Sequence, residues 1–346
     1  MLARDAGPTV PPVVSQHIGI FACPACGEAV TVSIARGIEC SACHRSFDCE
    51  GGIARLFCAN GWDDAKLDVT DVIRSFYEGN PFPGYKDLDS AWSLRERAGK
   101  GIFAHLLDEQ IPHGARILDV GCGTGQLSSF LSMRWGRTVF GSDLSLASLR
   151  LGQDFKERNH LDNVAFLQMN LFRPAFRQES FDLVICNGVL HHTADPFLGF
   201  LSISRLVKRG GYIVVGLYNT YGRIPTDVRR FIFGFLGTRL KFLDARLRDT
   251  HLSDKRKHIW FMDQYRNPHE SKHTFGEVLS WFDQGGFEFV NGIPKLRAFE
   301  QMTSEERLFE KSPQGGRVDH FLVQLGMLLR GGREGGFFVM IGRRRA

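Results

Sequence analysis

From residue 115 onward the chain alternates short apolar runs with amphipathic runs, and this alternation limits its fold more than any other feature. The apolar runs predict strands at 116–120, 139–142, 164–169, 181–186, 212–217, 287–290 and 337–341. The amphipathic runs predict helices at 126–135, 146–158, 196–208 and near 274–284. Strands that alternate with helices pair in parallel, because each connection has to cross over the sheet. We therefore predict an α/β fold with a doubly wound sheet.

Size and charge exclude several classes of protein. The 346 residues suffice for about two domains, and a hydrophobic share of 43% is typical of a folded chain. The net charge of +5 and pI of 8.8 are below the values of dedicated nucleic-acid binders. No uncharged apolar stretch is long enough for a membrane span, and the first residues lack the apolar core of a signal peptide. These features predict a cytoplasmic protein without a transmembrane segment.

Six of the eight cysteines fall between Cys23 and Cys58. Cys23-Pro-Ala-Cys26 and Cys40-Ser-Ala-Cys43 are separated by thirteen residues, close to the spacing of a four-thiolate zinc site. Each pair sits on a predicted tight turn, so that four sulfur atoms can converge on one ion. The alternative, two disulfides, is disfavoured in a reducing compartment. We predict a structural Zn²⁺ bound by Cys23, Cys26, Cys40 and Cys43.

A glycine-rich turn follows the first strand of the predicted sheet, in the sequence Ile117-Leu-Asp119-Val-Gly121-Cys-Gly123-Thr-Gly125. Glycines at alternate positions allow a sharp turn and let a ligand lie against the main chain. A dinucleotide site needs a further glycine where Gln126 stands, which disfavours NAD. Asp143 ends the second strand 18 residues after Gly125, where a carboxylate can accept both hydroxyls of a ribose.

The acid two residues before this glycine pattern resembles motif I of the class I S-adenosylmethionine-dependent methyltransferases, type 11-like, and the similarity extends over residues 100 to 220. The resemblance implies a Rossmann-like, seven-stranded sheet and S-adenosyl-L-methionine as cofactor. The cysteine-rich segment is similar to the zinc ribbons of the methyltransferase-activator type. The implied organisation is a flexible lead-in at 1–20, a zinc ribbon at 21–60 and a methyltransferase domain at 66–346 with an insertion at about 222–270.

The resemblance also implies where the cofactor binds. The implied set comprises the glycine turn, the ends of the next three strands and an upstream aromatic residue: Asp119, Gly121, Cys122, Gly123, Gly125, Asp143, Leu144, Met169, Asn170, Leu171, Asn187 and Tyr77. Asn170 stands where the family has an acid that accepts the adenine amine, and an amide oxygen accepts the same bond. Tyr77 or Tyr85 is expected to cover the sulfonium by a cation–π contact, or else the aromatic turn that contains them fills the space between ribbon and sheet.

The adjacent His191 and His192 follow the fourth strand, where many members of the family carry such a pair. If the acceptor group is a hydroxyl, a base has to take its proton, and these histidines are the best-placed candidates for a catalytic role. The alternative is that the pair packs a helix or shapes the cofactor site.

The insertion interleaves basic with aromatic residues, namely Arg229, Arg230, Arg239, Lys241, Arg246 and Arg248 with Phe231, Phe233, Phe235 and Phe242. Such a stretch can form a lid over a substrate, contact anionic lipid or bind phosphates. A partly solvated helix packed on the core is the plainer alternative.

The sequence therefore predicts an S-adenosylmethionine-dependent methyltransferase that acts by in-line displacement on a small-molecule or lipid-like biosynthetic acceptor. One alternative is an RNA methyltransferase, acting on rRNA or tRNA, that uses the ribbon for substrate recognition. Against methylation of a base amine, Asn187 is followed by Gly188 and not by proline. The other alternative is a non-catalytic cofactor-binding protein whose ribbon docks a partner.

Overall fold

The computed structural model describes residues 10–62, 68–84, 90–236, 240, 242–250, 252–329 and 335–346. Tyr85 of the upstream aromatic turn, and Arg239 and Lys241 of the basic stretch, lie outside the described residues. Within the described part of the chain, none of the helices combines the length and apolar character that a membrane span requires.

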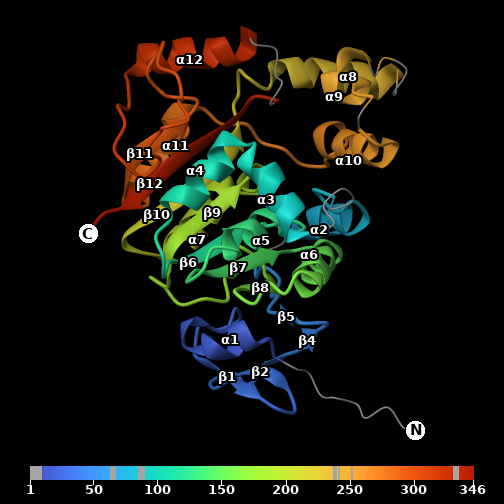
Figure 1. Ribbon diagram of the computed structural model, residues 1–346, viewed down its shortest axis with the longest axis vertical. Coiled ribbons are helices and arrows are strands. Elements are labelled where there is room, and N and C mark those ends of the chain that lie inside the picture. Colours follow the sequence, from blue (N-terminus) through green and yellow to red (C-terminus); the bar gives the residue numbers. More distant parts are fainter. Residues whose placement is uncertain are drawn as a thin grey trace.

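A nine-stranded sheet forms the centre of the molecule, in the order β11-β12-β10-β9-β6-β7-β8-β5-β4 (Figure 1). The strands are β4 (Cys49–Glu50), β5 (Ile53–Arg55), β6 (Arg116–Val120), β7 (Thr138–Asp143), β8 (Val164–Gln168), β9 (Phe181–Asn187), β10 (Val207–Tyr218), β11 (Phe287–Ile293) and β12 (Phe337–Arg344). The pairs from β10 to β5 are parallel, whereas β12 runs antiparallel to both of its neighbours. The chain moves outward from β6 to β8 and then returns to place β9 beside β6. This reversal of strand order creates a ligand crevice at the carboxyl ends of the strands.

Helices cover both faces of this sheet. They are α2 (Thr70–Gly79), α3 (Ala91–Gly99), α4 (Ile102–Gln110), α5 (Gln126–Ser132), α6 (Leu146–Arg158), α7 (Pro196–Ser204), α8 (Ile224–Leu236), α9 (Ala245–Arg248), α10 (Asp254–Tyr265), α11 (Phe275–Gln284) and α12 (Arg317–Leu329). Successive residues of β6 enter different cores, since Ile117 packs with α4, α5 and α6, and Leu118 packs in the core of α7 and α11. The doubly wound, Rossmann-like architecture is thus confirmed.

Some predicted boundaries differ from the structure. β6 and α6 have the predicted bounds, but α7 ends at Ser204 instead of residue 208. The reason is that Leu206 and Val207 are fully buried in the sheet core, which ends the helix and begins a long β10. α12 was not predicted at all.

The N-terminal region is joined to the main sheet more closely than a separate ribbon would be. A small sheet is formed by β1 (Val30–Ser33), β2 (Gly37–Cys40) and β3 (Ser46–Phe47). β4 and β5, within the range predicted for the ribbon, instead extend the predicted seven strands to nine, because β5 pairs with β8.

The described part of the predicted flexible lead-in also carries structure. Residues Pro12–Gln16 form helix α1, followed by the short 3₁₀ turn η1 (Ile18–Ile20). Val13 and Val14 are buried in the same apolar core as Phe140 of β7. Burial of this apolar surface fixes the segment against the sheet.

Candidate active site

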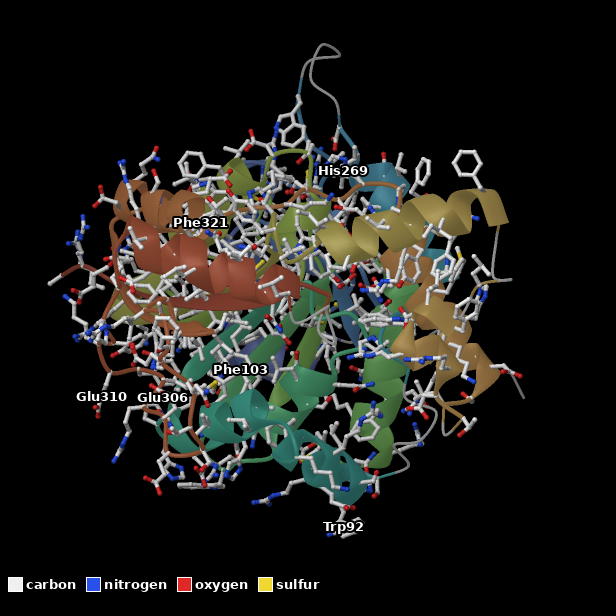
Figure 2. The ribbon with its side chains drawn as sticks, turned by 90° about the horizontal axis from the view of Figure 1, so that it is seen from above. Trp92, Phe103, His269, Glu306, Glu310 and Phe321 are labelled. Carbon is white, nitrogen blue, oxygen red and sulfur yellow. The ribbon has the colours of Figure 1, made fainter. Side chains whose placement is uncertain are left out.

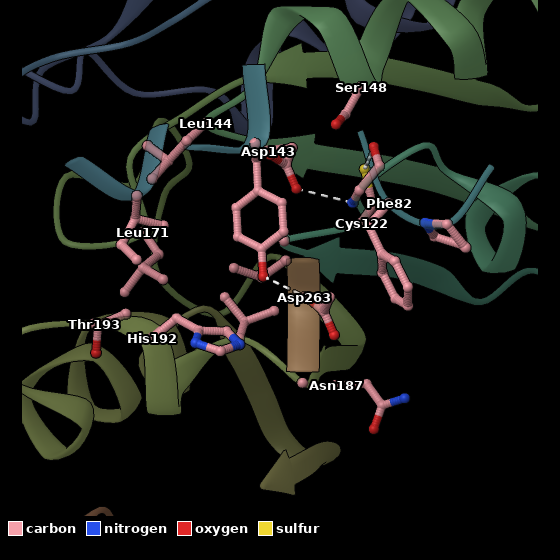
Figure 3. A pocket seen from close by; sticks show the side chains of 18 of the residues that line it. Phe82, Cys122, Asp143, Leu144, Ser148, Leu171, Asn187, His192, Thr193 and Asp263 are labelled. Carbon is pink, nitrogen blue, oxygen red and sulfur yellow. Dashed lines mark hydrogen bonds between the residues drawn. The ribbon is translucent and has the colours of Figure 1, made fainter. Parts of the chain in front are cut away.

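A cavity opens at the carboxyl ends of β6, β7, β8 and β9, at the crevice that the strand order creates (Figure 3). Its volume of ≈ 560 Å³ is within the range of roughly 300–1,000 Å³ found for small-molecule sites. Twelve of the residues predicted from the sequence line it, namely Tyr77, Asp119, Gly121, Cys122, Gly123, Asp143, Leu144, Met169, Asn170, Leu171, Asn187 and His192. Gly125 and His191 are not among the lining residues.

The glycine turn requires its glycines for steric reasons. Gly121, Gly123 and Gly125 all have positive φ, of 67°, 56° and 73°. A Cβ on Gly121 would lie 2.3 Å from Val189, and one on Gly123 would lie 2.2 Å from the carbonyl oxygen of Phe82. Gly125 lies one step farther on, where a Cβ would clash with the ring of Phe166 at 2.3 Å. It therefore serves the packing of the turn and not the wall of the cavity.

Two carboxylates line the cavity beside this turn, the buried Asp119 and the partly exposed Asp143. The Ser128 hydroxyl donates to Asp119 Oδ2 at 2.7 Å, yet burial, with Asp143 nearby, raises the pKa of Asp119 to about 6. Asp143 accepts hydrogen bonds from the backbone N–H groups of Gly123 and Ser145, each at 2.8 Å. Each carboxylate oxygen of Asp143 thus keeps a second lone pair with which to accept a hydroxyl of a ligand.

Asn170 is held by a segment that the sequence analysis did not connect to the site. Its amide nitrogen donates to the carbonyl of Cys58 at 3.0 Å and to Asn60 Oδ1 at 2.8 Å. Its amide oxygen accepts from the Phe172 N–H at 3.1 Å and, having two lone pairs, can accept one more bond. The chain after β5 therefore orients a residue at the floor of the cavity.

The insertion contributes the opposite wall of the cavity. Arg246, Trp260, Asp263 and Gln264 all line it, and the Arg246 guanidinium lies 3.9 Å from the centre of the Trp260 ring. The Tyr77 hydroxyl donates to Asp263 Oδ1 at 3.0 Å, so that α2 and α10 meet across the cavity (Figure 3). Burial, together with Asp263, raises the pKa of Tyr77 well above its usual value. Arg246 belongs to the basic and aromatic stretch noted in the sequence, whereas no sequence pattern marked Trp260 or Gln264.

His192 is the better placed of the two histidines. Its Nδ1 lies 2.8 Å from the backbone carbonyl oxygen of His269. A carbonyl only accepts, so the hydrogen-bond network assigns the proton to Nδ1 and leaves Nε2 with a free lone pair. Burial lowers the pKa of His192, which favours the neutral imidazole.

His191 is buried behind this wall. Its ring lies 4.4 Å from the ring of Tyr218, and neither of its nitrogens has a hydrogen-bond partner within the described part of the chain. Burial, with His192 and Arg223 nearby, lowers its pKa well below the usual value. The imidazole therefore stays neutral and packs as a core side chain.

A buried ion pair anchors the insertion. Arg223 donates twice to Glu270, at 2.9 and 2.6 Å, and both side chains are almost completely inaccessible to solvent. Arg230 also donates to Glu270, at 2.9 Å. Burial alone would raise the pKa of Glu270, but Arg223 lowers it below its ordinary value. Glu270 follows His269 directly, so this pair also holds the carbonyl that orients His192.

The four predicted zinc ligands converge in the N-terminal region. The sulfur atoms of Cys23, Cys26, Cys40 and Cys43 all lie within 4.8 Å of one another. The Sγ–Sγ distance is 3.7 Å between Cys23 and Cys43 and 3.5 Å between Cys26 and Cys40. Tetrahedral coordination at about 2.3 Å requires sulfur atoms about 3.8 Å apart, so the cluster fits a zinc ion.

Comparisons with known proteins bear on the region around the cavity. Residues 118–215 match the family described as the methyltransferase domain. An uncharacterized protein of Synechococcus sp. is 25% identical over 252 residues, which cover 64% of this chain and 60% of that protein. A ubiquinone biosynthesis O-methyltransferase of Alkalilimnicola ehrlichii is 35% identical over 125 residues, which cover 36% of this chain and 47% of that protein. The chain thus spans about half to three fifths of the length of these relatives.

Among solved structures, PKMT2 from Rickettsia typhi has a similar fold, with a TM-score of 0.50 and 16% identity. The similarity covers 72% of this chain and 54% of that protein. Together, the family match and the strand order of the sheet confirm the resemblance seen in the sequence. Residues 118–215 belong to the S-adenosylmethionine-dependent methyltransferase domains of class I fold.

Proposed function

We propose that the protein is an S-adenosylmethionine-dependent methyltransferase whose acceptor is a hydroxyl group of a small or lipid-like biosynthetic molecule. The observation that carries this proposal is the state of His192, which lines the same cavity as the glycine turn, Asp119 and Asp143 and whose Nδ1 hydrogen bond leaves Nε2 with a lone pair. The relatives named ubiquinone biosynthesis O-methyltransferase support an oxygen acceptor of this class.

The residues around the cavity fit the proposed cofactor. Asp143 has free lone pairs that can accept the ribose hydroxyls, and the Asn170 amide oxygen has one that can accept the adenine amine. The ionised carboxylate of Asp119 attracts the positive charge of the sulfonium compound. S-adenosylmethionine, when bound, supplies an activated methyl group. The chain then has to align the acceptor and exclude water, which accelerates transfer by avoiding loss of entropy at the barrier.

His192 would take the proton of the acceptor hydroxyl at Nε2. The imidazolium so formed is stabilised by the nearby carboxylates of Asp263 and Glu270, both of which favour the charged form. Its Nδ1–H stays bonded to the His269 carbonyl throughout, which keeps the ring oriented. Cys122 and Cys186 are unsuited to act as thiolates, because burial raises the pKa of both thiols.

The test is to incubate the zinc-loaded protein with methyl-labelled cofactor and a lysate of the source organism. We expect label in the organic-extractable or small-molecule fraction, and none with the variant Asp119→Ala. Label in RNA would replace this proposal by RNA methylation, with the ribbon as a candidate recognition element. Failure of the protein to bind the cofactor at micromolar concentration would favour the non-catalytic alternative.

A further inference from the structure

Two helices far apart in the sequence leave an unusual amount of apolar surface uncovered. Nineteen large apolar residues are exposed in the described part of the chain, and eleven of them fall within residues 221–243 and 318–329. Phe235 of α8 and Leu329 of α12 are 77% and 76% exposed. Scattered exposed apolar residues are ordinary, but a concentration of them marks an interaction site.

The spacing on α8 shows a second apolar face and not a random scatter. Ile224, Val228, Phe231 and Phe235 recur at helical intervals and are all exposed. The inward side of the helix already has its partners, since Phe233 is buried with its ring 4.7 Å from that of Tyr265. The helix is thus apolar on the side that packs and also on the side that faces outward.

α12 repeats this arrangement. Its inward Gln324 is buried and binds the side chain of Asn219 at 2.9 Å, whereas Phe321 and Leu329 are exposed. The two helices lie along the same side of the molecule, at the top in Figure 1 and facing the viewer in Figure 2. They are adjacent, because a Cβ on Gly222, just before α8, would lie 3.2 Å from Met327 of α12. Together, the outward residues of α8 and α12 form one surface, here called the α8–α12 face.

The charge of the insertion indicates what covers this face. Residues 222–270 contain eleven Lys and Arg against six Asp and Glu, an excess equal to the net charge of the whole chain, +5. The side chains of the acids Asp244, Asp263 and Glu270 are buried, as is that of the base Arg223. The exposed charged residues in the described part of this stretch are four bases and one acid, namely Arg246, Arg248, Lys255, Arg266 and Asp254. A second copy of the chain would bring the same positive charge to the contact. A membrane with anionic lipids complements both features, because its headgroup phosphates attract the bases and its acyl chains accommodate the apolar side chains.

We propose that the α8–α12 face docks on the surface of a membrane that contains anionic lipids. Phe231, Phe235 and Phe321 would enter the boundary between headgroups and acyl chains, with the basic residues of the insertion among the phosphates. The same insertion supplies Trp260 and Asp263 to the cavity wall, so docking brings the cavity close to apolar molecules in the bilayer. The proposal concerns membrane binding alone and stands whether or not a methyl acceptor is found.

The test is co-sedimentation of the full chain with vesicles of phosphatidylcholine, with and without phosphatidylglycerol. We expect binding to the anionic vesicles that weakens at high salt. The double variant Phe231→Ser/Phe235→Ser should bind at least about tenfold more weakly, since two buried aromatic side chains are lost from the interface. The matched control is Trp92→Ser/Phe299→Ser, which removes two aromatic residues elsewhere on the surface. They are 72% and 97% exposed, against 68% and 77% for Phe231 and Phe235, and the control should bind like the wild type. Unchanged thermal unfolding and cofactor affinity would show that both variants fold.

Three results would overturn the proposal. The wild type could fail to sediment with anionic vesicles, or the control variant could lose binding as strongly as the test variant. In the third, light scattering would detect a dimer that only Phe231→Ser/Phe235→Ser abolishes, without any vesicle binding. That result would make the α8–α12 face a contact between copies of this chain. Label transfer in the lysate is measured separately, so failure of membrane binding and failure of the proposed methylation are distinguishable.

Discussion

At the scale of single residues, the adjacent His191 and His192 have the same chemistry but opposite environments. The His192 ring is hydrogen-bonded at Nδ1 and lines the cavity, whereas neither ring nitrogen of the buried His191 has a hydrogen-bond partner among the described residues. We expect His192→Ala to reduce turnover by about 10²–10⁴-fold, the contribution typical of a general base. His191→Leu keeps the volume of a packed side chain and should reduce turnover by less than about tenfold. Steady-state kinetics with the identified acceptor measure both, and an equal loss in the two variants would contradict the assignment.

Asp119 gives the site a dependence on pH. Burial raises its pKa from 3.8 to about 6, so its negative charge is lost as the pH falls through about 6. We expect the affinity for S-adenosylmethionine to decrease below this pH, and calorimetric titration at pH 5 to 8 measures it. Asp119→Asn should bind weakly at every pH in this range.

The same raised pKa has a consequence for stability. The folded state binds the proton of Asp119 more tightly than the unfolded state, so this residue destabilises the fold increasingly as the pH rises from 3.8 to about 6. Above about pH 6, this pKa difference between the folded and unfolded states lowers the free energy of unfolding by on the order of 3 kcal/mol. Asp119→Asn without ligand should therefore unfold at higher urea concentration than the wild type at pH 7.5, and at a similar one at pH 4. If the urea midpoints of variant and wild type differed by the same amount at both pH values, this would contradict the raised pKa.

At the scale of elements, the insertion depends on the buried pair of Arg223 and Glu270. Glu270→Gln leaves the Arg223 guanidinium buried without a full counter-charge, and such a loss costs about 3–5 kcal/mol. We expect a lower unfolding free energy and faster proteolysis within residues 222–270, because α8 and α10 lose their anchor. Asp227→Asn breaks the more exposed pair with Lys272 and should cost at most about 1 kcal/mol. Equal costs for the two variants would show that burial of the pair is not decisive.

At the scale of the whole molecule, the cysteine cluster is coupled to the catalytic sheet through packing. Phe21 lies two residues before Cys23, and its ring is 4.7 Å from that of Phe176 in the core that includes Phe140. We expect one zinc per chain by elemental analysis, and a lower midpoint of thermal unfolding of the whole chain after chelation. Cys26→Ser should lose the metal. Cys49→Ser, outside the cluster, should retain it, and equal zinc contents in the two variants would contradict the ligand assignment.

The sequence by itself determined the features that depend on neighbouring residues. The alternation of apolar runs predicted the seven strands, because a run of a few consecutive apolar residues is enough to indicate a buried strand. The glycine turn and the acid at the end of β7 could be placed at one edge of the sheet, because parallel strands share that edge. The paired cysteine turns likewise predicted a cluster that the structure brings together.

Only the tertiary structure decided contacts between segments far apart in the chain. Tyr77 meets Asp263 across 186 positions, and Asn170 meets Asn60 across 110. The tautomer of His192 depends on the carbonyl of His269, and the outward face of α8 depends on which side packs against α10. No local pattern encodes such contacts, because they result from the way the chain crosses the sheet and from the shapes that meet there.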